Sequence, residues 1–239
     1  MNTELQSRIS QIRESVLKND FQNEELLKLA KDCISQNAKK ELLHQFLDIA
    51  HLSNVSINIY KSKQVDIWFN YILEIIKLSN FNVGYLLKQR SERYKNKIAF
   101  HIINKGNLLD IPYFTLWKKV IEVGKGISSF KHDNEDPIIG LLTHNQLNSV
   151  LVDLACLSFG VKVIPIPLNV TAKHASYIIN HSEISHLFIG GKNGEKIWNE
   201  IKQSHSIIDI NLSETNKTKD YHLDWNGFLN KSDQVKDFD

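Results

Sequence analysis

A glycine-rich stretch with two lysines is the part of this sequence that most suggests phosphate binding. It reads Gly-Gly-Lys-Asn-Gly-Glu-Lys over residues 190–196. A P-loop needs a glycine and a lysine at a fixed distance from its first glycine, followed by serine or threonine, so that backbone amides and the ammonium group surround the phosphates. Glu195 stands where the second glycine is needed. The stretch is therefore predicted to be a surface turn.

A second glycine pair, Gly124 and Gly126, flanks Lys125. A dinucleotide-binding fingerprint would need a third glycine at position 129, where this chain has Ser129. The pair also falls inside a helical pattern, so no nucleotide loop is predicted there.

Three histidines in the second half of the chain suggest a metal site. His174 and His181 are seven residues apart, which can place them on one helix face, and His186 follows shortly after. No cysteine or acidic pair completes four ligands at a recognisable spacing. A metal site is therefore not predicted.

The acidic residues towards the end of the chain are scattered, and no nucleophile stands near an evident base. We expect these carboxylates to be solvated surface groups and not paired acid–base catalysts; they are Asp209, Asp220, Asp224, Asp237 and Asp239. No residue is assigned as catalytic, cofactor-binding or metal-binding.

Composition excludes some classes of protein. The 239 residues are 42% hydrophobic and 23% charged, with a formal net charge of only +2, so neither nucleic acid nor a membrane surface is an expected partner. Cys33 and Cys156 lie in apolar helical patterns and are predicted to be buried thiols, not a disulfide. No leader-like segment opens the sequence, and no stretch approaches the roughly 18 apolar residues of a membrane span. A cytoplasmic location is expected.

Residues 1–79 are predicted to form a small helical unit. Apolar residues recur there at helical spacing in stripes separated by breaks near Asn19, Asn54 and Asn80. The stripes include Leu5, Ile9, Ile12, Val16, Leu26, Leu29, Ala30, Cys33, Leu42, Leu43, Phe46, Leu47, Trp68, Ile72, Ile75 and Ile76.

Residues 80–239 have the alternating pattern of a layered α/β domain. A hairpin is predicted from 97–103 and 108–111, with its register left open. Thr115 is predicted to cap a helix that ends near Ser129.

The pattern then becomes strand, helix, strand, helix, strand, helix, strand. Buried strands are predicted at 138–142 and 161–165, and further strands at 187–189 and 207–210. Asn145 and Thr171 are predicted helix caps, Gly160 a left-handed helix end, and Ile197, Trp198 and Ile201 the apolar face of the last helix. Right-handed crossovers make the sheet mostly parallel. After residue 210 the chain is polar, so one sheet edge is expected to be open and to favour self-association.

Several of these landmarks occur in an order and spacing that resemble the AMP-binding, adenylate-forming ligases. The resemblance runs from about residue 83 to 189, and more weakly to 239. It rests on Phe114-Thr115-Leu116-Trp117, on residues 137–145 (PIIGLLTHN), 153–161 (DLACLSFGV), 163–167 (VIPIP), 171–179 and 182–189. As residue types, all of these are accounted for by helix caps, helix ends and strand stiffening.

The resemblance implies the N-terminal part of an acyl-CoA synthetase. Such a ligase joins a carboxylate to AMP from ATP and then transfers the acyl group to a thiol, with ATP, magnesium and coenzyme A as cofactors of the full-length enzyme and a fatty acid as the favoured carboxylate. The phosphate-binding loop and catalytic lysine of the family do not occur in these 239 residues. We therefore expect the chain to stop before them and to be inactive alone, and whether it is by itself an enzyme stays open.

Two other functions are compatible with the sequence. The chain can be a non-catalytic interaction module whose helical unit recruits a partner. Alternatively, residues 80–239 can be a stand-alone nucleotide-binding α/β domain. The coding DNA just after residue 239 separates the ligase fragment from the interaction module, and the affinity of this chain for ATP tests the nucleotide-binding domain.

Overall fold

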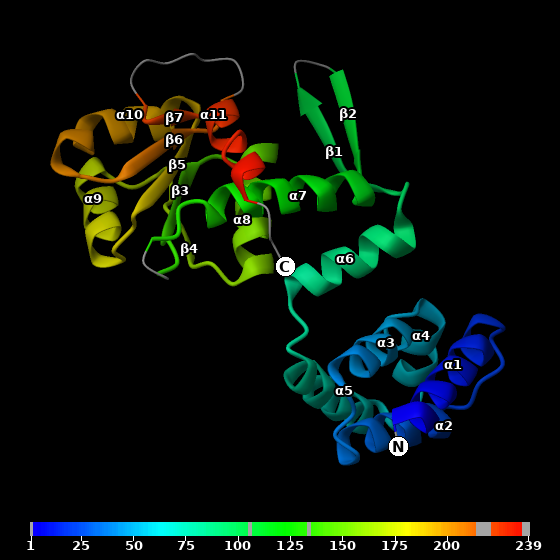
Figure 1. The fold of residues 1–239 in the computed structure, drawn as a ribbon. Coiled ribbons are helices and arrows are strands. Elements are labelled where there is room, and N and C mark those ends of the chain that lie inside the picture. Colours follow the sequence, from blue (N-terminus) through cyan, green and yellow to red (C-terminus); the bar gives the residue numbers. More distant parts are fainter. Residues whose placement is uncertain (1, 105–106, 133–134, 214–220, 236–239) are drawn as a thin grey trace. The chain divides into compact units, whose positions relative to one another are not determined.

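The computed structural model describes residues 2–104, 107–132, 135–213 and 221–235. It divides into two compact units, Met1–Asn82 and Val83–Asp239 (Figure 1). Each unit has its own hydrophobic core. None of the described helices is long and apolar enough to cross a membrane.

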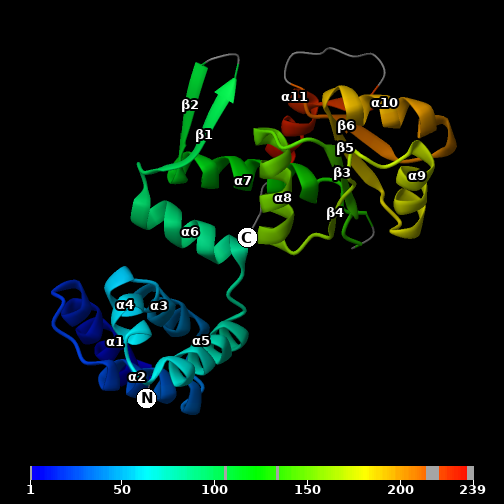
Figure 2. The ribbon, with the colours of Figure 1, turned by 180° about the vertical axis from the view of Figure 1, so that it is seen from behind.

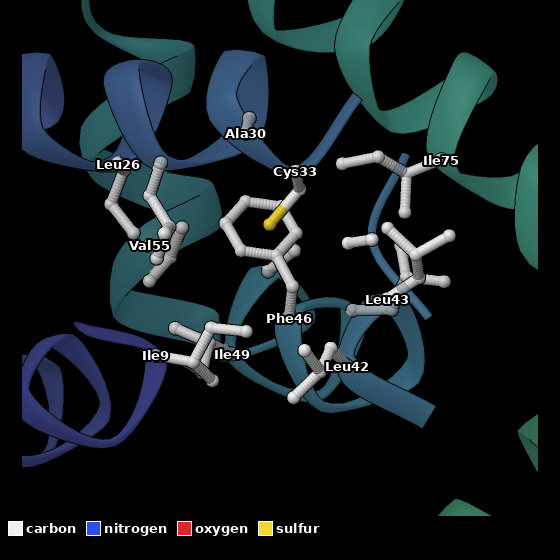
Figure 3. Close-up of a cluster of buried hydrophobic side chains, with 14 of the residues drawn as sticks. Ile9, Leu26, Ala30, Cys33, Leu42, Leu43, Phe46, Ile49, Val55 and Ile75 are labelled. Carbon is white, nitrogen blue, oxygen red and sulfur yellow. The ribbon is translucent and has the colours of Figure 1, made fainter. Parts of the chain in front are cut away.

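The first unit is entirely helical in its described part. Its helices are α1 (Asn2–Leu17), α2 (Asn23–Ser35), α3 (Lys40–Ala50), α4 (Ser53–Tyr60) and α5 (Val65–Ser79). Helix α4 was not predicted, because its sequence SNVSINIY alternates polar and apolar residues and begins at the expected break. The predicted stripes of the other helices converge on one core, to which Phe46 and Cys33 both belong (Figure 3).

Helix α6 (Val83–Tyr94) opens the second unit and was also missed by the sequence pattern. It leads to β1 (Ile98–Asn104) and β2 (Asn107–Pro112), which form the predicted antiparallel hairpin. Its register, which the sequence left open, pairs Ile103 with Leu108. Helix α7 (Tyr113–Ser128) follows and ends where expected.

Thr115 does not cap α7, contrary to prediction. It lies in the first turn of the helix, whose N-cap is Pro112. The backbone amides of Tyr113 and Phe114 donate to the carbonyl oxygens of Lys97 and Lys95, at 3.0 and 3.1 Å. Because carbonyl groups of the segment before β1 accept from these helix-end donors, a capping hydroxyl is not required for them.

A five-stranded parallel sheet forms the centre of the second unit, in the order β4-β3-β5-β6-β7. Its strands are β3 (Ile139–Thr143), β4 (Val163–Pro165), β5 (His186–Gly190), β6 (Ile208–Asn211) and β7 (Leu223–Asp224). The connecting helices are α8 (Leu147–Phe159), α9 (Ala172–His181) and α10 (Gly191–Ile201), and α11 (Trp225–Leu229) follows β7. The predicted α/β class and parallel sheet are confirmed.

The helices cover both faces of this sheet. Both views show α9 and α10 on one side of the strands and α7 and α8 on the other (Figures 1 and 2). Successive side chains of β5 accordingly alternate between two cores: Phe188 packs with α7, α8 and α11, whereas Leu187 and Ile189 pack with α9 and α10. Burial on both faces explains why β3 and β5 are continuous apolar runs.

Strand β4 differs from its prediction as a buried strand. It is the outer strand of the sheet, and Pro165 at its end is exposed. At the opposite edge, β7 pairs with only two residues of β6. Both outer strands of the described sheet are therefore short, which limits pairing with another chain through the sheet edge.

The two cysteines are free and fully buried, as predicted. Cys33 belongs to the core of the first unit and Cys156 to the second. Burial raises the pKa of the Cys33 thiol to about 11 and that of Cys156 to about 12. The thiols pack as small apolar side chains.

Candidate functional site

The topology of the sheet indicates where a ligand site would be. After β3 the chain crosses to β4 at one side, and then to β5 at the other side of β3. Ligands of open α/β sheets bind at the carboxyl ends of the strands where the order reverses. Thr143 ends β3 directly beside Gly190, which ends β5. The candidate site thus comprises residues 143–146 and 190–192.

On the β3 side, the polar groups bond to one another. Gln146, not the predicted Asn145, is the N-cap of α8. Its backbone amide donates to Ser149 Oγ at 3.1 Å, a bond of the capping-box type, and its Nε2 donates to Thr143 Oγ1 at 3.0 Å. These side chains are held by the strand end and the helix start. At the other end of α8, Gly160 has the predicted left-handed conformation.

On the β5 side, two glycines permit very close packing. A Cβ atom at Gly190 would lie 2.1 Å from Gln146 Nε2, and one at Gly191 would lie 2.4 Å from His144 Nδ1. Gly191 also has φ +74°, which disfavours any other residue. Side chains from the β3 end therefore fill the space above the glycines, where a phosphate cradle would have to be open.

The predicted surface turn at residues 190–196 is wrong. Gly190 ends β5, and α10 begins at Gly191. The apolar face formed by Ile197, Trp198 and Ile201 is buried as predicted, and the helix extends back from it by two turns. Gly194 permits this extension, because a Cβ there would lie 2.4 Å from the Leu142 carbonyl oxygen. The glycines are thus required for helix–sheet packing.

The three histidines occupy different settings. His174 and His181 lie on α9, whereas His186 begins β5 and is buried. His186 bonds to Ser185 Oγ at 2.9 Å and stacks on Phe130 with ring centroids 4.1 Å apart. Desolvation, with a smaller effect from Lys231, lowers the pKa of His186 to about 4. It is a neutral core histidine.

Asp209 is buried, contrary to its prediction as a solvated carboxylate. It is 3% exposed. Its Oδ2 accepts from Trp198 Nε1 at 2.5 Å, and its Oδ1 accepts from the His222 backbone amide at 2.9 Å and lies 2.5 Å from His222 Nδ1. The sequence signal was Trp198 itself, because a buried indole N–H needs an acceptor. Asp209 joins α10, β6 and the chain before β7.

Of the other four aspartates predicted to be solvated, one lies within the described residues and three lie outside them. Asp224 caps α11 by accepting from the Gly227 amide at 2.7 Å. Asp220, Asp237 and Asp239 lie outside the described residues.

One nucleophile does contact a base, which the sequence did not indicate. Ser176 Oγ lies 2.9 Å from His205 Nε2. His205 also stacks on Trp198, and desolvation lowers its pKa. A serine nucleophile of the triad type needs an acid on the other imidazole nitrogen, and no described carboxylate bonds to His205. The pair connects α9 to the segment before β6 and is not a triad.

The described residues do not fit the cofactors of a ligase. No group of three histidine, cysteine, aspartate or glutamate residues in the described ranges could hold a metal ion. The glycines at the strand ends are covered on their Cβ side by Gln146 and His144. The described part of the candidate site is packed and internally hydrogen-bonded.

Comparisons with solved structures show the fold. Coronafacic acid ligase from Pectobacterium brasiliense is similar with a TM-score of 0.54 and 17% identity, over 63% of this chain and 29% of that one. The A domain of carboxylic acid reductase from Segniliparus rugosus, solved with AMP and a co-purified carboxylic acid, has a TM-score of 0.53 and 8% identity, over 67% of this chain and 31% of that one. This chain thus spans about a third of the length of these structures.

A search of curated proteins finds no match to this sequence. The family model described as AMP-binding enzyme matches residues 87–237, which is more than half of the chain and nearly all of the second unit. The chain therefore belongs to the AMP-binding enzyme family.

Proposed function

We propose that this chain supplies the N-terminal part of an ATP-dependent acid–thiol ligase. The match of the AMP-binding family over residues 87–237 carries the proposal. The order of the parallel strands and the likeness to coronafacic acid ligase and to a carboxylic acid reductase A domain support it.

In the proposed reaction, a carboxylate oxygen attacks the α-phosphorus of ATP, and the bond to the β-phosphate breaks to release pyrophosphate. A thiol sulfur, that of coenzyme A, then attacks the acyl carbon of the adenylate, and AMP leaves. We propose a fatty acid as the carboxylate, from the general resemblance that residues 153–167 bear to the family. Magnesium would neutralise the phosphates in the complete enzyme.

Residues 1–79 are proposed to be a helical extension, and residues 80–239 an incomplete ligase subdomain in the cytoplasm. This chain would act as structural support, and the residues that bind ATP, magnesium and coenzyme A would belong to the remaining two thirds of the ligase. The close packing of Gln146 and His144 against Gly190 and Gly191 supports this division.

Calorimetry of this chain with ATP and magnesium tests the proposed division. We expect no binding tighter than about 100 μM, which corresponds to about −5.5 kcal/mol. Tighter binding would favour the stand-alone nucleotide-binding domain and would contradict the assignment of the nucleotide site to other residues.

ATP–pyrophosphate exchange tests the reaction itself. The polypeptide to use is the one encoded by the complete reading frame, with fatty acids of several chain lengths as substrates and this chain alone as the control. We expect exchange that depends on a fatty acid for the complete polypeptide and none for the control. Exchange that no carboxylate stimulates would contradict the ligase, and exchange with only short or aromatic acids would contradict the fatty acid.

The exposed apolar side chains of α4 and α5 favour one alternative, a non-catalytic interaction module. In that case the reading frame would contain no serine-, threonine- and glycine-rich loop after residue 239, and exchange would be absent from every polypeptide tested. The presence of the loop would remove this alternative.

A further inference from the structure

Large apolar side chains are exposed along α4 and α5 of the first unit. Ile57 is 53% exposed, Tyr60 is 79% exposed, and Phe69 and Leu73 are each 55% exposed. Adjacent apolar residues of this size seldom face water on a monomer, and such patches commonly mark interfaces. In the first unit this surface thus has the composition of an interaction site.

A groove runs between the same two helices. Its volume is about 400 Å³, and it is lined by Ile57 and Tyr60 of α4 and by Val65, Trp68 and Phe69 of α5. The lining is apolar apart from Ser56 and Lys61. A groove of this kind can receive a large apolar side chain, which is the usual anchor of a protein interface.

The exposed residues of α5 are arranged so that two copies of this helix can pair with each other. Asp66, Phe69, Leu73 and Lys77 follow at intervals of three or four residues, so they lie along one side of the helix, and all four are exposed. The acid is in the first turn and the base is in the last turn. The two apolar residues lie between them.

When two α5 helices pair antiparallel, every residue of this row gains a complementary partner from the other copy. With a two-fold axis that crosses the row midway between Phe69 and Leu73, Asp66 of one copy faces Lys77 of the other, and Phe69 faces Leu73. Within its own chain Lys77 contacts only Glu74 among the described ion pairs, at 3.9 Å on the surface, an interaction that contributes little. Opposite charges at both ends fix the register of such a pair, and the shared apolar centre supplies contact area.

We propose that α4 and α5 form a homodimer interface, whose occupant is a second copy of this chain packed antiparallel along α5. This inference is independent of the proposed ligase activity. It also differs from self-association through the sheet, for which the outer strands β4 and β7 offer only three and two residues.

Sedimentation of the full chain over a dilution series tests the interface. We expect a monomer–dimer equilibrium. Because like charges would then face each other, Asp66→Lys and Lys77→Asp should each weaken the dimer roughly tenfold or more, and the double variant should restore it. Leu73→Ser should weaken the dimer, while Leu157→Ser, a matched change at an exposed position of α8 in the second unit, should not.

Circular dichroism should show equal helicity for all of these variants, since the changed side chains are exposed. A monomer at every concentration would overturn the proposal. So would a dimer indifferent to Leu73→Ser, or a double charge variant that associates no better than the single ones. Either of these last two results would place the contact on another surface, such as the sheet edge.

Discussion

Asp209 links three segments of the second unit through bonds to Trp198 and His222. We expect Asp209→Ala to lower the free energy of unfolding by about 2–4 kcal/mol, because the buried indole N–H would lose its acceptor. Urea unfolding followed by tryptophan fluorescence measures this loss. Asp136→Ala is the control, since its exposed ion pair with Lys131 contributes about 1 kcal/mol at most. Equal, small losses for both variants would show that the Asp209 bonds do not stabilise the fold.

His186 makes the stability of the second unit depend on pH. Its pKa is about 4 in the folded chain, against 6.5 for an ordinary histidine, so the unfolded state binds more protons between these values. The contribution of neutral His186 to the free energy of unfolding is therefore fully present above pH 6.5. It is lost as the pH falls, and the loss reaches about 3 kcal/mol near pH 4.

Urea titrations between pH 7 and pH 4 measure the effect of His186. His186→Gln should flatten the curve in this window, because glutamine does not titrate. His174→Gln, at an exposed position of α9, is the control for replacing a histidine by glutamine. If wild type and His186→Gln lose stability in parallel, other groups cause the acid sensitivity.

At the residue scale, sequence reasoning identified the buried thiols but not the buried carboxylate. Cys33 and Cys156 were recognisable because each sits within an apolar stripe of its own helix. Asp209 was not, because its partners are Trp198 and His222, which only the sheet and its crossover bring together. Ser176 and His205 are likewise 29 residues apart, and no local pattern predicts their contact.

At the scale of elements, helix caps were predicted correctly only where residues next to the helix end provide the cap. Thr171 accepts from the His174 amide at 3.3 Å, as predicted for a helix that follows an open loop. Thr115 fails as a cap because carbonyls of a neighbouring segment already satisfy the first amides of α7. The alternation of strands and helices along the chain from β3 to β6 was predicted, since continuous apolar runs separated by amphipathic helices have few other interpretations, but the order of the strands in the sheet was not.

The close approach of α10 to β3 gives a prediction for Gly194. Glycine to alanine inside a helix usually stabilises by about 1 kcal/mol. Here the added Cβ would lie 2.4 Å from the Leu142 carbonyl oxygen, a backbone atom of a central strand. Gly194→Ala should therefore destabilise the chain by about 1–3 kcal/mol, the range for overpacking.

Asn193→Ala is the matched control for Gly194→Ala, because Asn193 is exposed on the same helix. It should be neutral or slightly stabilising in a thermal or urea melt. Stabilisation by Gly194→Ala would mean that α10 shifts away from the sheet easily.

At the scale of the whole molecule, the chain consists of two units with separate cores, and each unit contains one buried thiol. Thiol reagents attack the thiolate, and burial raises the pKa of both cysteines, so both should react slowly in the folded chain. Labelling of Cys33 and Cys156 thus measures how often each unit opens.

Destabilising one unit should expose only its own cysteine. Phe46 is buried in the same core as Cys33, and Phe46→Ala should lower the free energy of unfolding by about 3–5 kcal/mol (Figure 3). We expect labelling of Cys33 to accelerate by orders of magnitude, while labelling of Cys156 keeps its wild-type rate. Phe188→Ala, in the second core, should produce the reverse pattern. Mass spectrometry of the labelled peptides measures both rates in one sample. Acceleration at both sites by either variant would mean that the two units unfold together, so the helical extension could not be treated as an independent module.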